Sequence, residues 1–127
     1  MCLVINKKQC PKGYKTARKN IPCYKLLLKT SSGTFETPYI REPVDIKTGI
    51  EATYFQTKPT NKLRIYQGVH SYTNLISANS NRNSWYNLMD ATIHKSVVIL
   101  KGYIPKGTKY WVGMWGTFCS ERIVFVQ

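Results

Sequence analysis

The pattern of apolar and polar positions is clearest in the last third of the chain, where it predicts an all-β unit. Residues 96–100 (SVVIL) form a continuous apolar run rich in β-branched side chains, which is typical of a strand buried on both faces. Gly102 breaks that run, and the segment 105–108 (PKGT) predicts a turn, because proline presets φ and glycine accepts a positive φ. Residues 109–113 (KYWVG) and 122–126 (RIVFV) predict two further strands on either side of a loop.

The first two thirds of the chain contain shorter runs. Residues 23–29 (CYKLLLK) predict a strand that turns into a hairpin through Phe35, although the three leucines are equally compatible with a helix. The polar segment 74–83 begins the clearest helix, and Ser84 is the predicted N-cap for residues 85–89. Further strands are predicted at 3–5, 52–57 and 62–66, and a turn at 45–49.

These patterns predict an α+β fold, namely a compact single domain over residues 1–127, mainly antiparallel sheet with one or two short helices. Residues 6–20 are rich in lysine and contain proline and glycine, so they predict a basic loop or arm. No apolar run approaches 18 residues, so we expect no membrane span. The apolar start of the chain is too short for a signal peptide, and a cytoplasmic location is therefore expected.

The charge of the chain narrows the class of partner. It has 19 Lys and Arg against 6 Asp and Glu, which gives +13, and the excess is uneven. Residues 1–30 hold eight bases and no acid, residues 31–60 three bases and four acids, and residues 61–127 eight bases and two acids. Such a charge suits an anionic partner: a nucleotide, a nucleic acid or an acidic protein surface. A solvated basic surface that serves solubility is the alternative.

The cysteines and histidines do not indicate a metal site. No Cys-x-x-Cys pair is present, and both histidines are far from the cysteines in sequence. We therefore expect reduced cysteines, no metal and no cofactor, with a disulfide from Cys23 to Cys2 or Cys10 as the alternative.

The first candidate site is a cluster around the end of the strand predicted at 62–66. Aromatic rings stack on bases, and arginine or protonated histidine offers charge and donors to phosphate. Ordinary packing on a sheet surface is the alternative. The residues of this cluster are Arg64, Tyr66, His70 and Tyr72.

The second candidate site lies on the C-terminal hairpin, where basic residues alternate with large aromatic residues. This combination suits stacking and cation–π contacts with a nucleotide, whereas a role of Tyr110 or Trp111 in the core is the alternative. The residues are Lys106, Lys109, Tyr110, Trp111 and Trp115. A third candidate is Glu121, which precedes an apolar strand as a catalytic base or ribose ligand would, or as the surface partner of a lysine or arginine would.

The last third also resembles the C-terminal part of ADP-ribosyltransferases. Residues 104–108 (IPKGT) and 120–125 (SERIVF) match that family's strand, Pro-x-Gly turn and catalytic Glu at the head of an apolar strand. Residues 66–68 (YQG) and 77–80 (SANS) are similar to its aromatic-Arg-Gly and Ser-Thr-Ser motifs. The resemblance implies a transferase-like scaffold in which Glu121, with His70, would be the catalytic residues of an enzyme.

This chain departs from the family pattern at two positions. Gln67 stands where the family has the arginine that grips NAD, and Cys119 stands where a second acid often precedes the catalytic Glu. The segments MCL, GVHSY and IPKGTKYWVG are in addition similar to small uncharacterised proteins of bacteriophages and their hosts. Together the two resemblances imply a scaffold that binds an ADP-ribose-like or cyclic nucleotide without transferring it.

The sequence therefore favours non-enzymatic binding of a phosphate-bearing nucleotide, as in a viral protein that sequesters a host cyclic-nucleotide or ADP-ribose-type immune signal. The alternatives are a nucleic-acid-binding protein that uses the basic N-terminal arm, an ADP-ribosyltransferase-like enzyme that uses Glu121, and an inhibitor of an acidic host protein. A homo-oligomer is compatible with each. The expected phosphate contacts are Arg64, Arg82, Lys106 and Lys109, the stacking residues Tyr66, Trp111 and Trp115, and the ribose contacts His70 and Glu121.

Overall fold

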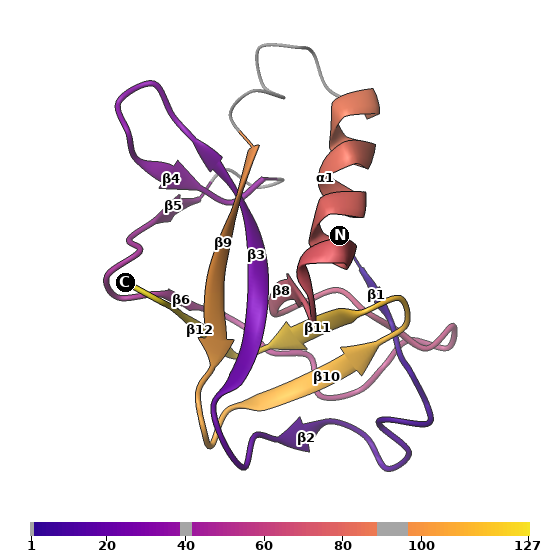
Figure 1. Ribbon diagram of the computed structural model, residues 1–127. Helices are drawn as coiled ribbons and strands as arrows, with labels where there is room; N and C mark the ends of the chain where they lie inside the picture. Colours follow the sequence, from indigo (N-terminus) through magenta and orange to yellow (C-terminus); the bar gives the residue numbers. More distant parts are fainter. Residues whose placement is uncertain (1, 39–41, 89–96) are drawn as a thin grey trace.

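The computed structural model describes residues 2–38, 42–88 and 97–127, with the backbone alone for 84–88. Within these ranges the chain forms twelve strands and one helix, and each described strand pairing is antiparallel (Figure 1). The predicted predominance of antiparallel sheet is therefore confirmed, with less helix than an α+β mixture suggests. The elements are β1 (Leu3–Val4), β2 (Lys15–Thr16), β3 (Ile21–Lys29), β4 (Phe35–Glu36), β5 (Pro43–Val44), β6 (Ile50–Glu51), β7 (Arg64–Ile65), β8 (Val69–Tyr72), α1 (Leu75–Leu88), β9 (Val97–Ile104), β10 (Lys109–Gly113), β11 (Thr117–Ser120) and β12 (Arg122–Phe125).

One large sheet contains most of the strands, in the order β2-β10-β11-β8-β3-β9-β12-β6. The longest pairing joins β3 to β9, from Ile21 opposite Ile104 to Leu28 opposite Val97. β4 continues the end of β3 as a hairpin and pairs with β5, while β1 and β7 form a separate pair. In Figure 1, α1 stands beside β3 on one side of the sheet.

The alternation of side chains along β3 gives the protein a core on each side of the sheet. Leu26 and Leu28 pack under α1 against Tyr72, Ala78 and Val97. On the opposite face, Cys23 and Leu27 belong to a second core with residues of β8, β11 and β12. A third cluster, around Trp111 and Cys119, is covered by β1 and β7. A side chain on the second face of β3 is therefore placed in the interior of the protein.

Several predicted elements are confirmed. The structure contains the strands at 23–29 and 109–113, the hairpin through Phe35, and the turn at 45–49, where the Gly49 N–H donates to the Asp45 carbonyl at 2.9 Å. Residues 6–20, predicted as a loop or arm, lie against the sheet, because β2 pairs with β10 and the Asn6 N–H donates to the Val112 carbonyl at 3.0 Å.

β8 and β11 are among the strands that the sequence pattern does not indicate. β8 (VHSY) follows Gly68 and contains a histidine and a serine, yet all four residues are buried because the strand lies between β11 and β3. β11 (TFCS) lies between the loop and the last strand that the pattern predicts, and Glu121 separates it from that strand. The predicted strand at 52–57 is wrong, since the residues that pair with β12 are Ile50 and Glu51.

Two predicted boundaries are also wrong. Gly102 does not end a strand, since β9 continues through it to Ile104. A Cβ at this position would lie 2.6 Å from the Val124 carbonyl oxygen of the adjacent strand, so the close approach of the two strands requires glycine. The helix begins at Leu75 and not after Ser84, with Asn74 as its N-cap: the Asn74 Oδ1 accepts the Ser77 N–H at 2.8 Å. Ser96 and Met89, the ends of two predicted elements, lie outside the described residues.

Across the described residues, no helix is long and apolar enough to cross a membrane.

Candidate functional site

The alternation of β3 places a lysine among apolar residues. Cys23, Lys25 and Leu27 share one face of the strand, and all three are buried. Only 8% of the Lys25 surface is exposed, which is rare for a lysine. Its Nζ donates a hydrogen bond to the backbone carbonyl oxygen of His70 at 2.8 Å.

The positive charge of Lys25 has no directly paired carboxylate among the described residues. Within the described ranges no carboxylate forms an ion pair with Lys25, and the His70 carbonyl is its hydrogen-bond acceptor. An ammonium group has three N–H donors, so two remain without a protein acceptor there. Burial lowers the pKa of Lys25 from 10.5 to about 8, which leaves the side chain mainly charged at pH 7.

The nearby thiols of Cys23 and Cys119 do not neutralise the charge of Lys25 either. Burial raises the pKa of Cys23 to about 11 and the pKa of Cys119 to about 12. Both groups are therefore neutral thiols at physiological pH, and neither supplies a thiolate to the ammonium. All four cysteines of the chain are free in the structure.

His70 contributes a neutral ring beside Lys25. Its Nε2 lies 2.9 Å from the Tyr66 carbonyl oxygen, which can only accept a hydrogen bond, so Nε2 carries the proton. Burial, with a smaller contribution from the charge of Lys25, lowers the pKa of His70 to about 4, against the opposing effect of the Tyr66 carbonyl. The same nitrogen lies 3.8 Å from the Cys119 Sγ. His70 is thus a positioned neutral donor and not a cationic phosphate ligand at pH 7.

Lys25 and His70 line an open pocket of about 320 Å³, which we call the Lys25 pocket. Its other walls are residues 50–54, residues 66–69, and Thr37, Pro38 and Glu42 near the β4–β5 connection. The pocket lies at the lower end of the size range of small-molecule sites. Two tyrosines stand at its mouth, Tyr54 with 60% and Tyr66 with 49% of its surface exposed.

Gln56 holds the segment that forms one wall of this pocket. Its Oε1 accepts the N–H groups of Tyr66 at 2.8 Å and Gln67 at 3.3 Å. Its Nε2 donates to the carbonyl oxygens of Lys58 at 2.8 Å and Arg64 at 3.2 Å, and its own carbonyl accepts the Trp111 Nε1–H at 2.8 Å. The Gln56 side chain therefore satisfies backbone groups of Lys58, Arg64, Tyr66 and Gln67.

Close packing of the backbone fixes the wall at Gly68. This residue has a φ of +143°, and a Cβ there would lie 2.5 Å from the Cys119 Sγ and 3.2 Å from the Ser120 carbonyl oxygen. Only glycine fits both the dihedral angle and the approach of β11. The backbone can therefore pass from Tyr66 into β8 only with a glycine at position 68.

The structure brings together part of the first candidate cluster. Tyr66 and His70 both line the Lys25 pocket, and the Tyr66 side chain raises the pKa of the exposed Arg64. Tyr72 lies apart, since it is 2% exposed and packs in the core beneath α1. Sequence reasoning missed Lys25 and Gln56; for Lys25 the signal was its position between two apolar residues of the same strand face.

The second candidate cluster does not form one site. Trp111 is 1% exposed and lies in the core, contrary to the expected stacking role. Lys106 is exposed on the β9–β10 turn, where its N–H donates to the Asn20 Oδ1 at 3.0 Å. The Lys109 Nζ lies 5.4 Å from the centre of the Tyr14 ring, a cation–π contact.

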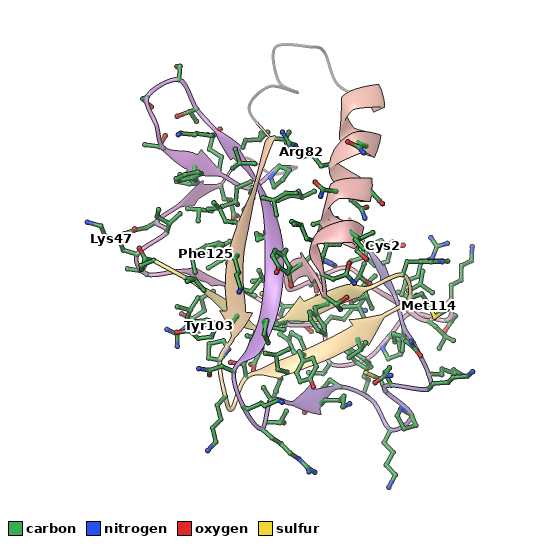
Figure 2. The ribbon with its side chains drawn as sticks, in the orientation of Figure 1. Cys2, Lys47, Arg82, Tyr103, Met114 and Phe125 are labelled. Atoms are coloured by element: carbon green, nitrogen blue, oxygen red, sulfur yellow. The ribbon has the colours of Figure 1, made fainter. Side chains whose placement is uncertain are left out.

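The remaining candidates lie at separate places. The Glu121 Oε1 accepts the Lys109 N–H at 2.8 Å, a structural contact between β10 and the start of β12. Trp115 is 76% exposed on the β10–β11 turn, and Arg82 lies on α1 (Figure 2). No group of three or more His, Cys, Asp or Glu that could hold a metal occurs in the described part of the chain.

No protein family matches this chain, and searches of curated proteins and of solved structures find no significant match.

Proposed function

We propose that this protein binds a small phosphate-bearing nucleotide in the Lys25 pocket, without chemical conversion of the ligand. The observation that carries the proposal is the buried ammonium of Lys25, which lines the pocket and has one backbone carbonyl as its protein acceptor. A buried charge without a counter-ion is costly for a folded protein. An anionic ligand supplies the missing counter-ion.

Phosphate is a suitable anion because its oxygens can accept both remaining N–H donors of Lys25. Charge-assisted hydrogen bonds of this kind are about twice as strong as neutral ones, and they gain further strength away from water. The pKa of Lys25, about 8 without a ligand, allows the amine to bind a proton together with the anion. Affinity for the ligand should therefore decrease as the pH rises above 8.

The mouth of the pocket favours a nucleotide over a bare phosphate. Tyr54 and Tyr66 present exposed rings on which a base can stack. The carboxylates of Glu42 and Glu51 line the same pocket and can accept hydrogen bonds from ribose hydroxyls or exocyclic amines. In this arrangement His70 donates through Nε2 to the protein and leaves Nδ1 as an acceptor.

The biological role that we propose follows the resemblance to small phage and host proteins. A viral protein that holds a cyclic nucleotide or an ADP-ribose-type signal would prevent it from reaching a host effector. The proposal includes no conversion of the ligand, so a ligand released from the protein should be chemically unchanged.

The test is isothermal titration calorimetry with a panel of AMP, NAD, ADP-ribose and cyclic mono-, di- and trinucleotides. Lys25→Met should abolish binding of the tightest member, whereas Lys101→Met, at an exposed position of the neighbouring β9, should leave it unchanged. Chromatography of the released ligand should recover it intact. Equal affinity of wild type and Lys25→Met would refute the site, and a converted ligand would refute the non-enzymatic function.

The ADP-ribosyltransferase alternative rests on the sequence resemblance. It requires release of nicotinamide from NAD that Glu121→Gln abolishes. The carboxylate of Glu121 accepts the Lys109 N–H and does not line the Lys25 pocket. Nicotinamide release in the wild type, lost in this variant, would favour the enzyme over the binding protein.

A further inference from the structure

A second hollow, of about 400 Å³, lies along β10 and the β10–β11 turn, and we call it the Trp115 groove. Tyr110, Val112 and Phe118 line it, and the rings of Tyr110 and Phe118 meet edge to face with centroids 5.9 Å apart. Lys15 and Trp115 also line this groove. It therefore combines an aromatic and aliphatic lining with a cation and an exposed indole.

The backbone holds Trp115 in this exposed position at a conformational cost. Its φ is +59°, in the left-handed region that bulky residues rarely adopt. The next residue, Gly116, is packed so closely that a Cβ would lie 2.5 Å from the Ser77 Oγ and 2.9 Å from the Thr73 Oγ1. The turn is thus fixed against the start of α1, while 76% of the Trp115 surface faces solvent. Strained residues with exposed side chains are frequent at binding sites.

The N-terminal segment lies next to this groove, and we call its exposed cations the basic face. β2 pairs with β10, and the N–H of Val112 donates to the Cys10 Sγ at 3.3 Å, so the segment is held on the sheet. The first acidic residue of the chain is Glu36. The cations of this basic face are all exposed: Lys7, Lys8, Lys12, Lys15, Arg18 and Lys19.

We propose that single-stranded nucleic acid binds here, with an unpaired base in the Trp115 groove and the phosphate backbone on the basic face. Stacking of bases on aromatic rings beside a cationic track is the usual means of binding single strands without sequence preference. Lys15 belongs to both parts, since it lines the groove and lies on the basic face. A duplex cannot place a paired base in such a groove, so the site selects single strands.

The experiment is fluorescence anisotropy of a fluorescein-labelled 12-nucleotide oligo(dT) with the full chain, at several salt concentrations. Trp115→Asn removes the ring, and asparagine tolerates the positive φ; it should weaken binding about tenfold. Lys15→Ala should weaken binding and reduce the slope of log affinity against log salt by about 0.7, the value for one phosphate contact on a single strand.

Two matched variants distinguish binding at this site from general charge attraction and from binding in the Lys25 pocket. Lys47→Ala removes an exposed cation that lies on the opposite side of the molecule from Met114, the neighbour of Trp115 (Figure 2), and should change neither affinity nor slope. Lys25→Met should leave oligo(dT) binding intact, so failure of the nucleotide pocket does not affect this test.

Three results would overturn the proposal. One is wild-type affinity for oligo(dT) in both Trp115→Asn and Lys15→Ala, with circular dichroism showing that the variants are folded. Another is equal affinity for a duplex of the same length. The third is absence of oligo(dT) binding at 50 mM salt, including the case in which anionic lipid vesicles bind instead.

Discussion

The ammonium nitrogen of Lys25 lies 2.8 Å from the backbone carbonyl oxygen of His70, and this contact joins the central strands β3 and β8 beneath a solvent-open pocket. The lysine occupies a position at which its neighbours on the same strand face, Cys23 and Leu27, are fully buried. A charge retained at such a position destabilises the fold and is therefore evidence for a function that needs it.

The first prediction concerns stability and pH. In the folded protein the pKa of Lys25 is about 8, against 10.5 for an unperturbed lysine, so the unfolded chain binds more protons between these values. The destabilisation is fully present below pH 8 and is relieved as the pH rises toward 10.5, at an order of magnitude of about 3 kcal/mol. Lys25→Met should therefore raise the free energy of unfolding at pH 7.

Urea unfolding at pH 7, 8, 9 and 10 measures this effect as the difference between the variant and the wild type. The difference should shrink with rising pH. Cys23 and Cys119 contribute little to it up to pH 10, because burial raises their pKa values to about 11 and about 12 and keeps both thiols largely neutral in the folded wild type. A Lys25→Met protein that is less stable than wild type at pH 7 would show that the ammonium is well solvated or paired.

The second prediction concerns His70. Its pKa of about 4 means that the folded protein keeps the ring neutral while the unfolded chain protonates near pH 6.5. Stability should therefore decrease as the pH falls from 6.5 to 4. His70→Gln, whose Nε2 can still donate to the Tyr66 carbonyl, should lose part of this dependence. Nitrogen NMR of the wild type should show the Nε2–H tautomer at pH 6, and a titration midpoint above 6 would contradict the account.

The third prediction compares two glycines that both have a positive φ. Gly68→Ala adds a Cβ 2.5 Å from the Cys119 Sγ, whereas nothing lies within 4 Å of a Cβ at Gly107. Gly107→Ala should cost about 1–2 kcal/mol from backbone strain alone, and Gly68→Ala about 2–5 kcal/mol because overpacking is added. Thermal unfolding measures both, and equal losses would show that β11 can move away from Gly68.

The fourth prediction concerns the wall of the Lys25 pocket. Gln56→Ala removes the acceptor of the Tyr66 and Gln67 N–H groups, so hydrogen exchange of these two amides should accelerate at least about tenfold. Gln127→Ala, which removes a side chain that contacts the Ile46 and Phe125 carbonyls, is the control and should leave both amides protected. Unchanged exchange in Gln56→Ala would show that other contacts order this wall.

Local sequence patterns were sufficient to predict the elements whose secondary structure does not depend on the strands beside them. β3 and β10 are continuous β-prone runs, and the turn between Asp45 and Gly49 follows from their residue types. β8 was missed because its polar His70 and Ser71 are buried only through the strands on either side, which local periodicity does not reveal.

The candidate site was only partly predictable for the same reason. Tyr66 and His70 are close in sequence and chemically conspicuous, and both line the pocket. Lys25 comes 41 residues before Tyr66, and a lysine in a strand usually reaches solvent through its long side chain. Gln56 had no local signal, since its role arises from contacts with backbone groups of another segment.

The most direct test of the central claim is an NMR titration of the Lys25 side chain, with and without the nucleotide that binds most tightly in the calorimetric panel. We predict a midpoint near pH 8 for the free protein, because burial lowers the pKa of Lys25, and a clear rise when the ligand supplies the counter-ion. A midpoint near 10.5 in the free protein, or one that the saturating nucleotide leaves unchanged, would contradict the proposal that Lys25 holds the phosphate.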